Sequence, residues 1–536
     1  MPAALGSLRR PGAWTGLDTA RERKPVGAVW LQSLAPRLGL ATDAIATYRL
    51  PSLLLTALGV WLVLHLYRPV IGAQAAFIAA VLVAGTPVLV LQAHLAIAEP
   101  LVFPAMVAAQ LSLLRLYTSS ENGGARWMAG LFWIAQALSI PLNAFSVPIA
   151  SVTTLVALWI WDRRLDWLYH LRASVGLAAV AMAAALWLAT SAVVYVELPL
   201  RGQTLCEAFS ALAGSQQMNF PAYPGLFVAF LLLGFVPAQL LLIPAILRHR
   251  AIGLTPVARF LLAWMVGYLV YLELLSDKPA LYVVQNLFPP AAGLVALAAV
   301  KSHVRGDSLR IDAATTAFAV LVGLVAAPAA VYVLHHMVGT DAPLTTWIVA
   351  ASVSLLLVLA AIAACRSLLG VWLALGVAGV AVLNILVFGV VLPNLHGFWA
   401  SREIGSTLAV LEQCPDGPIE VIGHREPSLP FALGPRVVTT WPIEVAEASR
   451  ARGATLVIVE QRWERQLREE FVRRSPQALR RVACASAINV ARGCRLSFSF
   501  YVAGPSDQAT ACRSRASDRC PPPSAAPARD LGRDCT

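Results

Sequence analysis

Between residues 48 and 392 the chain consists of long apolar runs that are separated by short polar gaps. A run of roughly 17–25 mainly apolar residues is long enough to cross a bilayer as a helix. About twelve such runs are present, and they predict a polytopic α-helical membrane protein with about twelve transmembrane helices. The predicted spans are 48–67, 71–91, 97–117, 127–141, 144–161, 173–196, 225–247, 257–275, 281–300, 314–334, 345–364 and 369–392.

Arginine and lysine residues gather mainly in every second gap, and this alternation predicts the orientation of the chain. The positive-inside rule assigns the basic gaps to the cytoplasm. Those gaps hold Arg68, Arg115, Arg126, Arg163, Arg164, Arg172, Arg248, Arg250, Arg259, Lys301, Arg305, Arg310 and Arg366. The short gaps on the other face hold only Arg201 and Lys278. Residues 1–47 and everything after residue 392 are therefore expected outside the cytoplasm.

After residue 392 the pattern changes to short apolar strands that alternate with amphipathic helices, which is typical of a small α/β domain. Strands are predicted at 419–422, 437–440, 454–459, 481–485 and 496–502, and helices at 401–413, 445–452 and 463–474. We expect four regions. They are an outer N-terminal loop with an interfacial helix (1–47), a transmembrane bundle (48–392), a periplasmic α/β domain (393–503) and a disordered tail (504–536).

Composition restricts the possible functions. A hydrophobic content of 58% with 13% charged residues excludes an ordinary soluble enzyme. The net charge of +12 does not predict nucleic-acid binding, because much of the excess lies in the cytoplasmic gaps and no aromatic-interleaved basic stripe is present. Anionic lipid headgroups or lipid phosphates are the partners that this charge favours. No CxxC pair or histidine cluster predicts a metal site.

The cysteines agree with the predicted orientation. Cys365 lies at a membrane span, and the other seven are expected outside, where disulfides are permitted. Cys484 and Cys494 are near enough in sequence to bridge a hairpin, and the other pairings stay open.

Four polar side chains lie at or near the outer ends of the predicted spans. Glu99 opens the third span in HLAIAEPLVF, and Lys278 and Tyr282 open the ninth in SDKPALYVVQNLFPP. Lys24 precedes the interfacial segment 26–40. A carboxylate at membrane depth is costly unless it is paired or lines a wet cavity, although the helix dipole alone also favours an acidic residue there. Each lysine alone is typical of a snorkelling anchor, and Tyr282 alone of an aromatic belt.

Taken together, two cations and one carboxylate on the same face indicate a reaction on a lipid phosphate or a lipid-phosphate-linked donor. The lysines can hold a phosphate as point charges, and Glu99 can act as a base. Two further segments are ambiguous. The sequence from His424 to Ser428 predicts a solvated strand-to-helix turn, and the long gap 197–224 predicts a mobile lid.

Several of these segments resemble the membrane-embedded glycosyltransferases of the GT-C superfamily, in particular the aminoarabinose-transferase and protein-mannosyltransferase-like branch. RKPVGAVWLQSL, followed by YRLPSLLLTALGVWLVLHLYRPVIG, is similar to the family's Lys-Pro before an interfacial helix and its Arg-Leu-Pro span. HLAIAEPLVF looks like its acidic outer turn, and DKPALYVVQNLFPPAAGL like its Lys-x-x-x-Tyr segment. GHREPSLPFALG and INVARGCRLSFSFY look like segments of its outer domain.

The resemblance implies an inverting transferase in the bacterial inner membrane. Such enzymes take a sugar from an undecaprenyl-phosphate carrier and pass it, on the periplasmic face, to lipid A, another glycolipid or a protein. By resemblance, Lys24 and Lys278 hold the carrier phosphate, Tyr282 helps to position it, and Glu99 assists at the acceptor or the donor sugar. No cofactor is implied.

The chain also departs from the family pattern. The family has one more span than we count, and its first outer loop opens with an Asp-Glu pair, whereas Asp18 and Glu22 are the only acidic residues before Lys24. We expect that a first span with this pair precedes the present start. Met218-Asn219-Phe220 stands where the family has a loop histidine, so no loop metal site is expected. A catalytically impaired lipid-phosphate-binding protein is the main alternative, and a transporter is disfavoured because the candidate residues gather at one surface.

Overall fold

The structure is a computed structural model that describes most of the chain outside its two ends. The described residues are 26–41, 44–118, 125–143, 146–163, 166–194, 224–236, 238–251, 254–275, 283–305, 313–338, 340–366, 368–424, 428–434, 436–445, 454–474, 478–489, 494–504 and 512–514. The chain divides into two compact units. Among the described residues, the membrane unit comprises 26–331 and 343–390, and the C-terminal unit comprises 332–342 and 391–514.

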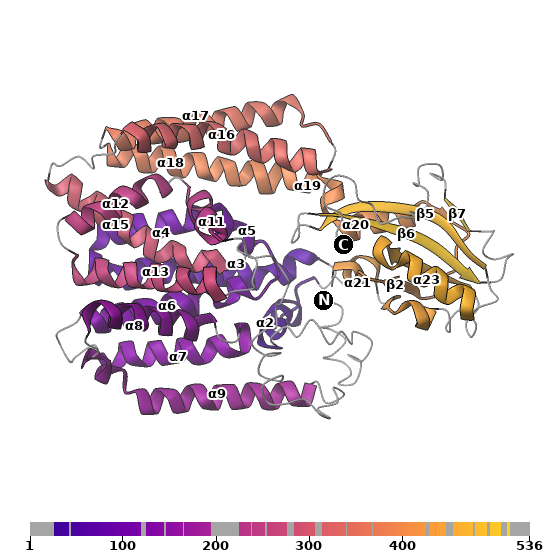
Figure 1. Cartoon of the computed structure of the whole chain (residues 1–536), viewed down its shortest axis with the longest axis horizontal. Coiled ribbons are helices and arrows are strands. Elements are labelled where there is room, and N and C mark those ends of the chain that lie inside the picture. Colours follow the sequence, from indigo (N-terminus) through magenta and orange to yellow (C-terminus); the bar gives the residue numbers. More distant parts are fainter. Residues whose placement is uncertain are drawn as a thin grey trace. The chain divides into compact units, whose positions relative to one another are not determined.

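The membrane unit is a bundle of helices (Figure 1). Its first helices are α2 (Val26–Arg37), α3 (Ile45–Ile71), α4 (Ala73–Gly85), α5 (Pro87–Ala93), α6 (Glu99–Thr118), α7 (Ala125–Asn143), α8 (Ser146–Asp162), η2 (Asp166–Leu171) and α9 (Ala173–Val194). They are followed by α11 (Leu226–Gly234), α12 (Gln239–Ala251), α13 (Pro256–Leu275), η3 (Val284–Leu287), α15 (Phe288–Arg305), α16 (Ala313–Val338), α17 (Leu344–Cys365), α18 (Leu369–Asn384) and η4 (Ile385–Val391).

Each predicted span corresponds to a helix or to a pair of helices in this bundle. Within the described residues, five helical stretches are long and apolar enough to cross a membrane: α3, α6, α13, α17 and Leu369–Asn394. The pair α4 and α5, bent by 63° at Thr86–Pro87, makes a sixth if it counts as one span. The missing backbone N–H of proline explains such a break. The total of about twelve spans stays a prediction.

Helix α6 lies at the centre of the membrane unit, where it packs against α3, α7, α8 and α13. In the most apolar 18-residue stretch of α6, 78% is buried, compared with 33% in the corresponding stretch of α3. At Gly59 of α3 an added Cβ would lie 2.3 Å from the ring of Phe103, so the missing side chain lets the two helices approach closely. Helix α9 instead exposes apolar side chains such as Val175 and Leu177. This distribution suits a bundle surrounded by lipid.

The C-terminal unit is built on a mixed sheet with strand order β3-β2-β4-β6-β5. Strands β3 (Val437–Thr439), β2 (Ile419–Ile422) and β4 (Thr455–Glu460) are parallel, whereas β6 (Cys494–Gly504) and β5 (Ala478–Asn489) add antiparallel pairs. Helices α20 (Ala400–Ala409), α21 (Ser428–Leu433) and α23 (Gln461–Arg474) complete it, and α19 (Leu392–Asn394) and η5 (His396–Phe398) precede them. The predicted α/β class of this region is confirmed.

Alternate residues of β4 explain how both faces of the sheet are covered. Leu456 and Ile458 pack in one apolar cluster with residues of α20 and α21. Val457 and Val459 pack in a second cluster with Leu467 of α23 and its neighbours. All six residues of β4 are buried, as expected for a strand with two covered faces.

Two sequence expectations for this unit need correction. The tail after residue 504 is not wholly unstructured, because Cys512 is disulfide-bonded to Cys414 and β7 (Arg513–Ser514) pairs with β1 (Leu411–Glu412). Strand β7 is only two residues long and is held in place by a bond to a cysteine far away in the sequence. The apolar pattern of the tail therefore could not reveal it. The expected bridge between Cys484 and Cys494 is also wrong. In the β5–β6 hairpin Cys484 lies opposite Ser499 and Cys494 lies opposite Asn489, so the two cysteines are five residue pairs apart, or about 16 Å, too far for a disulfide.

Candidate functional site at the start of helix α6

Glu99 is the first residue of α6, and its side chain is buried, with 2% of its surface exposed. Its Oε1 atom accepts no hydrogen bond from any of the described residues. No other acidic side chain in the described part of the membrane unit is buried to this degree. The helix dipole favours a carboxylate at this position, but it does not replace the donor that a buried oxygen needs.

Gln285, in η3, holds the segment before α15 against the start of α6. Its Nε2 donates to the backbone oxygen of Glu99 at 3.0 Å, and both residues are buried. Its Oε1 likewise has no hydrogen-bond partner in the part of the chain that is described. The next residue, Asn286, donates from Nδ2 to the Tyr268 hydroxyl at 3.2 Å. η3 is therefore fixed to both α6 and α13.

Helix α2 reaches the same end of the membrane unit. Gln32 donates from Nε2 to the backbone oxygen of Ile97 at 3.3 Å, two residues before Glu99. Ala28 of α2 packs in one apolar cluster with Ala98 and Leu101. An added Cβ at Gly27 would lie 2.6 Å from the backbone oxygen of Pro141, so only a glycine fits there without a shift. The start of α2 thus lies beside the start of α6 and the end of α7.

The other three candidate residues lie outside the described part of the chain. Lys24 stands two positions before α2, and Lys278 and Tyr282 stand just before Val283. The structure therefore places α2, which follows Lys24, and η3, which follows Lys278 and Tyr282, against the start of α6, where Glu99 lies. Their roles stay predictions. Most of the expected lid at 197–224 also lies outside the described residues.

The sequence did not single out Gln285 or Asn286. A pair of amide side chains inside the apolar run YVVQNLFPP was the available signal. Buried polar residues in a membrane segment are costly, and they mark interhelical contacts or sites.

The opposite end of α6 holds a different polar cluster. Tyr117 donates to Asp162 Oδ2 at 2.6 Å, and Arg259 pairs with Asp162 Oδ1 at 2.6 Å. These residues come from α6, α8 and α13. Tyr117 is eighteen residues from Glu99, or about 27 Å along the helix. Both oxygens of this carboxylate are occupied, which indicates a structural contact.

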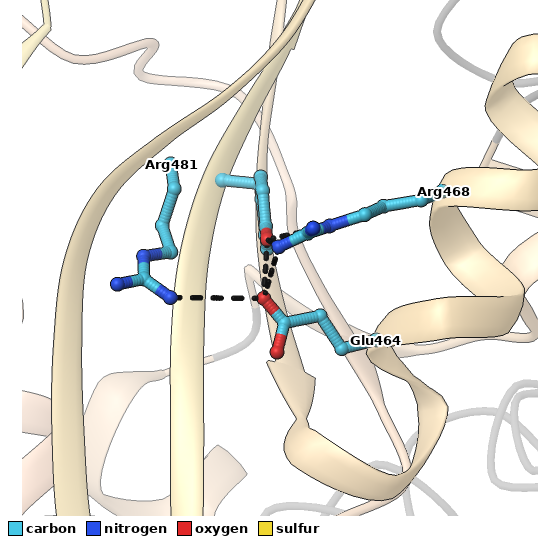
Figure 2. Close-up of polar contacts among 4 residues, drawn as sticks. Glu464, Arg468 and Arg481 are labelled. Atoms are coloured by element: carbon cyan, nitrogen blue, oxygen red, sulfur yellow. Dashed lines mark hydrogen bonds and ion pairs between the residues drawn. The ribbon is translucent and has the colours of Figure 1, made fainter. Parts of the chain in front are cut away.

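The C-terminal unit contains a buried glutamate of its own. Glu464 Oε1 accepts a hydrogen bond from the Tyr501 hydroxyl and another from Arg468 Nη2 at 2.8 Å, and Arg481 Nη1 lies 3.9 Å away. Figure 2 shows Arg468 reaching this carboxylate from α23 and Arg481 from β5. Burial, and then the hydrogen bond to Glu464, raises the pKa of Tyr501 to about 12. This satisfied cluster joins α23 to the sheet.

The predicted solvated turn from His424 to Ser428 lies between β2 and α21, but His424 itself is buried rather than solvated. β2 ends at Ile422, and Ser428 is the first residue of α21, while residues 425–427 are not described. The Ser428 hydroxyl lies 2.6 Å from that of Ser401 in α20. This contact ties α21 to α20 and gives the turn a structural role.

Two solved structures share the fold of this chain. The crystal structure of ArnT from Cupriavidus metallidurans in the apo state has a TM-score of 0.64 and 15% sequence identity, covering 93% of this chain and 91% of that chain. The structure of ArnT from the same organism bound to undecaprenyl phosphate has a TM-score of 0.62 and 14% identity, covering 89% and 88%. No protein-family model and no curated protein matches the sequence. The likeness extends over both units.

Proposed function

We propose that this chain transfers a sugar from an undecaprenyl-phosphate-linked donor to an acceptor on the periplasmic face of a bacterial inner membrane. The acceptor class is lipid A, another glycolipid or a protein. The observation that carries the proposal is the buried Oε1 of Glu99, which has no hydrogen-bond donor among the described residues and lies at the end of the unit where α2 and η3 meet α6. Two ArnT structures, one bound to undecaprenyl phosphate, support it through their shared fold.

In the proposed reaction, the acceptor oxygen attacks the anomeric carbon, and the bond from that carbon to the phosphate oxygen breaks. The phosphate leaves with the electron pair. Lys24 and Lys278 hold it and stabilise its developing charge, and Tyr282 positions it. Glu99 accepts the proton of the acceptor hydroxyl, because its buried Oε1 receives no hydrogen bond from the residues that the structure describes and so can take up a proton from the substrate. Attack on the side opposite the leaving group inverts the configuration.

The proposal is tested by carrier binding and carrier release. In proteoliposomes that contain both a sugar-linked donor and an acceptor such as lipid A, the wild type should transfer the sugar and release undecaprenyl phosphate. Lys24→Ala and Lys278→Ala should each weaken binding of undecaprenyl phosphate about tenfold, since each removes one charge from a desolvated phosphate. Lys301→Ala is the matched control, because Lys301 lies near the opposite end of α15 from η3.

The results separate this function from its main alternative. Binding of undecaprenyl phosphate without release of carrier from any donor would identify a protein that holds the lipid phosphate but has lost catalysis. Unchanged affinity in both lysine variants would leave the lysines as snorkelling anchors. Movement of an intact donor across the bilayer without cleavage would favour the transporter.

A further inference from the structure

The proposed mechanism assigns no role to Gln285. This residue is 1% exposed and donates from Nε2 to the backbone of Glu99. That bond fixes the orientation of the amide, so Oε1 is the acceptor atom that stays available. The start of α6 thus presents two buried acceptor oxygens, one on each of two hydrogen-bonded residues, and neither has a donor among the described residues.

Buried acceptors without donors are unfavourable, particularly inside a membrane protein. Several other amide oxygens in the described membrane unit share this condition, among them those of Gln136 and Gln239. Gln285 differs from them because its hydrogen bond joins it to Glu99. It also lies three positions after Tyr282, in the segment proposed to hold the donor phosphate.

We propose that Glu99 and Gln285 form a subsite for the hydroxyl groups of the donor sugar. This inference rests on the proposed function and deepens it. Carboxylate and amide oxygens require a ligand that donates hydrogen bonds. A phosphate diester brings only acceptor oxygens and would be repelled by Glu99. The sugar is the part of the donor that carries O–H or N–H groups, so it is the part that these two residues can recognise.

Gln285 also acts as a positioning residue in this proposal. Its bond to the Glu99 backbone sets the distance between the carboxylate and the segment that begins with Lys278. A hydroxyl bound by Gln285 Oε1 would align the sugar ring relative to Glu99. The phosphate and the sugar would then be held by different residues of the same segment.

The test is a comparison of affinities in nanodiscs. The probes are undecaprenyl phosphate and its glucose-, mannose- and aminoarabinose-linked forms. The wild type should bind at least one sugar-linked form more tightly than the bare carrier. Gln285→Met keeps the length of the side chain but removes the amide, and it should lower that preference about tenfold, a larger change than any loss of carrier affinity that follows from the missing bond to the Glu99 backbone. Gln136→Met, at another buried glutamine of the membrane unit, should keep the preference.

Each outcome bears on the proposal. An unchanged preference in Gln285→Met, or a wild type that binds all three sugar-linked forms no better than the bare carrier, would overturn it. In both cases the protein would still bind the carrier, so the proposed function would not be affected. A wild type that does not bind undecaprenyl phosphate would contradict both the proposed function and the sugar subsite. If Gln285→Met does not fold, Gln285→Asn, which shifts the amide by one methylene, should show a partial loss. Lowered affinity for an acceptor glycolipid alone would assign the subsite to the acceptor instead and would contradict the proposal.

Discussion

Glu464 in the C-terminal unit and Glu99 in the membrane unit are both buried, but their surroundings differ. Glu464 receives hydrogen bonds from Tyr501 and Arg468, with Arg481 nearby. Glu99 has one oxygen without a donor among the described residues, and its close polar neighbour Gln285 bonds to its backbone rather than to its carboxylate. The Glu464 carboxylate therefore joins elements of the fold through its Oε1, whereas Oε1 of Glu99 receives no hydrogen bond from the described residues.

If the proposed function holds, this difference in hydrogen bonding separates a structural carboxylate from a functional one more clearly than burial does. A satisfied buried carboxylate holds elements together, so its loss should affect folding. An unsatisfied one costs the fold free energy, so its loss should affect ligand binding or chemistry instead. Asp162 shows that the distinction does not simply follow the membrane, because this residue of the membrane unit is fully engaged by Tyr117 and Arg259.

The largest effect on stability should come from the disulfide of the C-terminal unit. Cys414→Ser removes a bridge that closes a loop of 98 residues, and the loss of this constraint on the unfolded chain costs about 4 kcal/mol. Pulse proteolysis in urea should show the change in β1, β2 and their neighbours. Binding of undecaprenyl phosphate should be unchanged, with Cys365→Ser as the control. Weaker carrier binding with unchanged proteolysis would contradict the inference that the disulfide stabilises the C-terminal unit and takes no part in binding the carrier.

A smaller effect should appear at high pH, through Tyr501. Its pKa is raised from about 10 in the unfolded chain to about 12 by burial and Glu464. The neutral phenol is favoured by the fold, so this contribution is complete below pH 10 and is lost as the pH rises to 12. It amounts to about 2–3 kcal/mol. Urea unfolding of the wild type and Tyr501→Phe at pH 9 and pH 11.5 measures it; equal pH dependence in both would refute it.

Glu464→Gln should lower the stability of the C-terminal unit by about 1–2 kcal/mol. The amide keeps the volume of the side chain but loses the charge that attracts Arg468 and Arg481, and Arg468 is partly exposed. Faster hydrogen exchange in α23 and β6 would report the change. Glu469→Gln is the control, because Glu469 is an exposed residue of the same helix. Similar exchange in both variants would mean that the buried cluster contributes little.

The smallest change is expected for Tyr117→Phe, at about 1 kcal/mol. It removes one hydrogen bond to Asp162 and leaves the ion pair with Arg259 in place. Thermal unfolding in detergent should register a small decrease, while the rate of carrier release stays at the wild-type level. A large loss of rate would show that satisfied carboxylates in this unit also take part in the reaction.

Much of the fold could be predicted from the sequence because the physical signals were strong. The lengths of the apolar runs predicted where the helices lie. The apolar composition of strands such as Ile419–Ile422 and Thr455–Glu460 predicted that they are buried. The bend at Thr86–Pro87 and the register of the β5–β6 hairpin were not predictable from apolar pattern. Pairing between distant segments, as between Cys414 and Cys512, depends on tertiary structure.

The candidate site was predictable only in part, for a related reason. Glu99 was noticeable because a carboxylate inside an apolar segment is rare. Gln285 carries no charge and lies within an apolar run, so its importance appears only when its bond across 186 residues to Glu99 is seen. The amide pair at Gln285 and Asn286 is a local signal, but it does not show which distant residue each amide contacts.

Glu99 is proposed to take part in the chemistry while Glu464 holds the fold together, and one variant tests this difference most directly. Glu99→Gln should lower the rate of undecaprenyl phosphate release from a sugar-linked donor by roughly 10²–10⁴-fold, because the proton acceptor is lost. Its melting temperature should equal or exceed that of the wild type, since a costly buried charge has been removed. A rate within about threefold of the wild type, together with a lower melting temperature, would show that Glu99 serves the fold and would contradict the account.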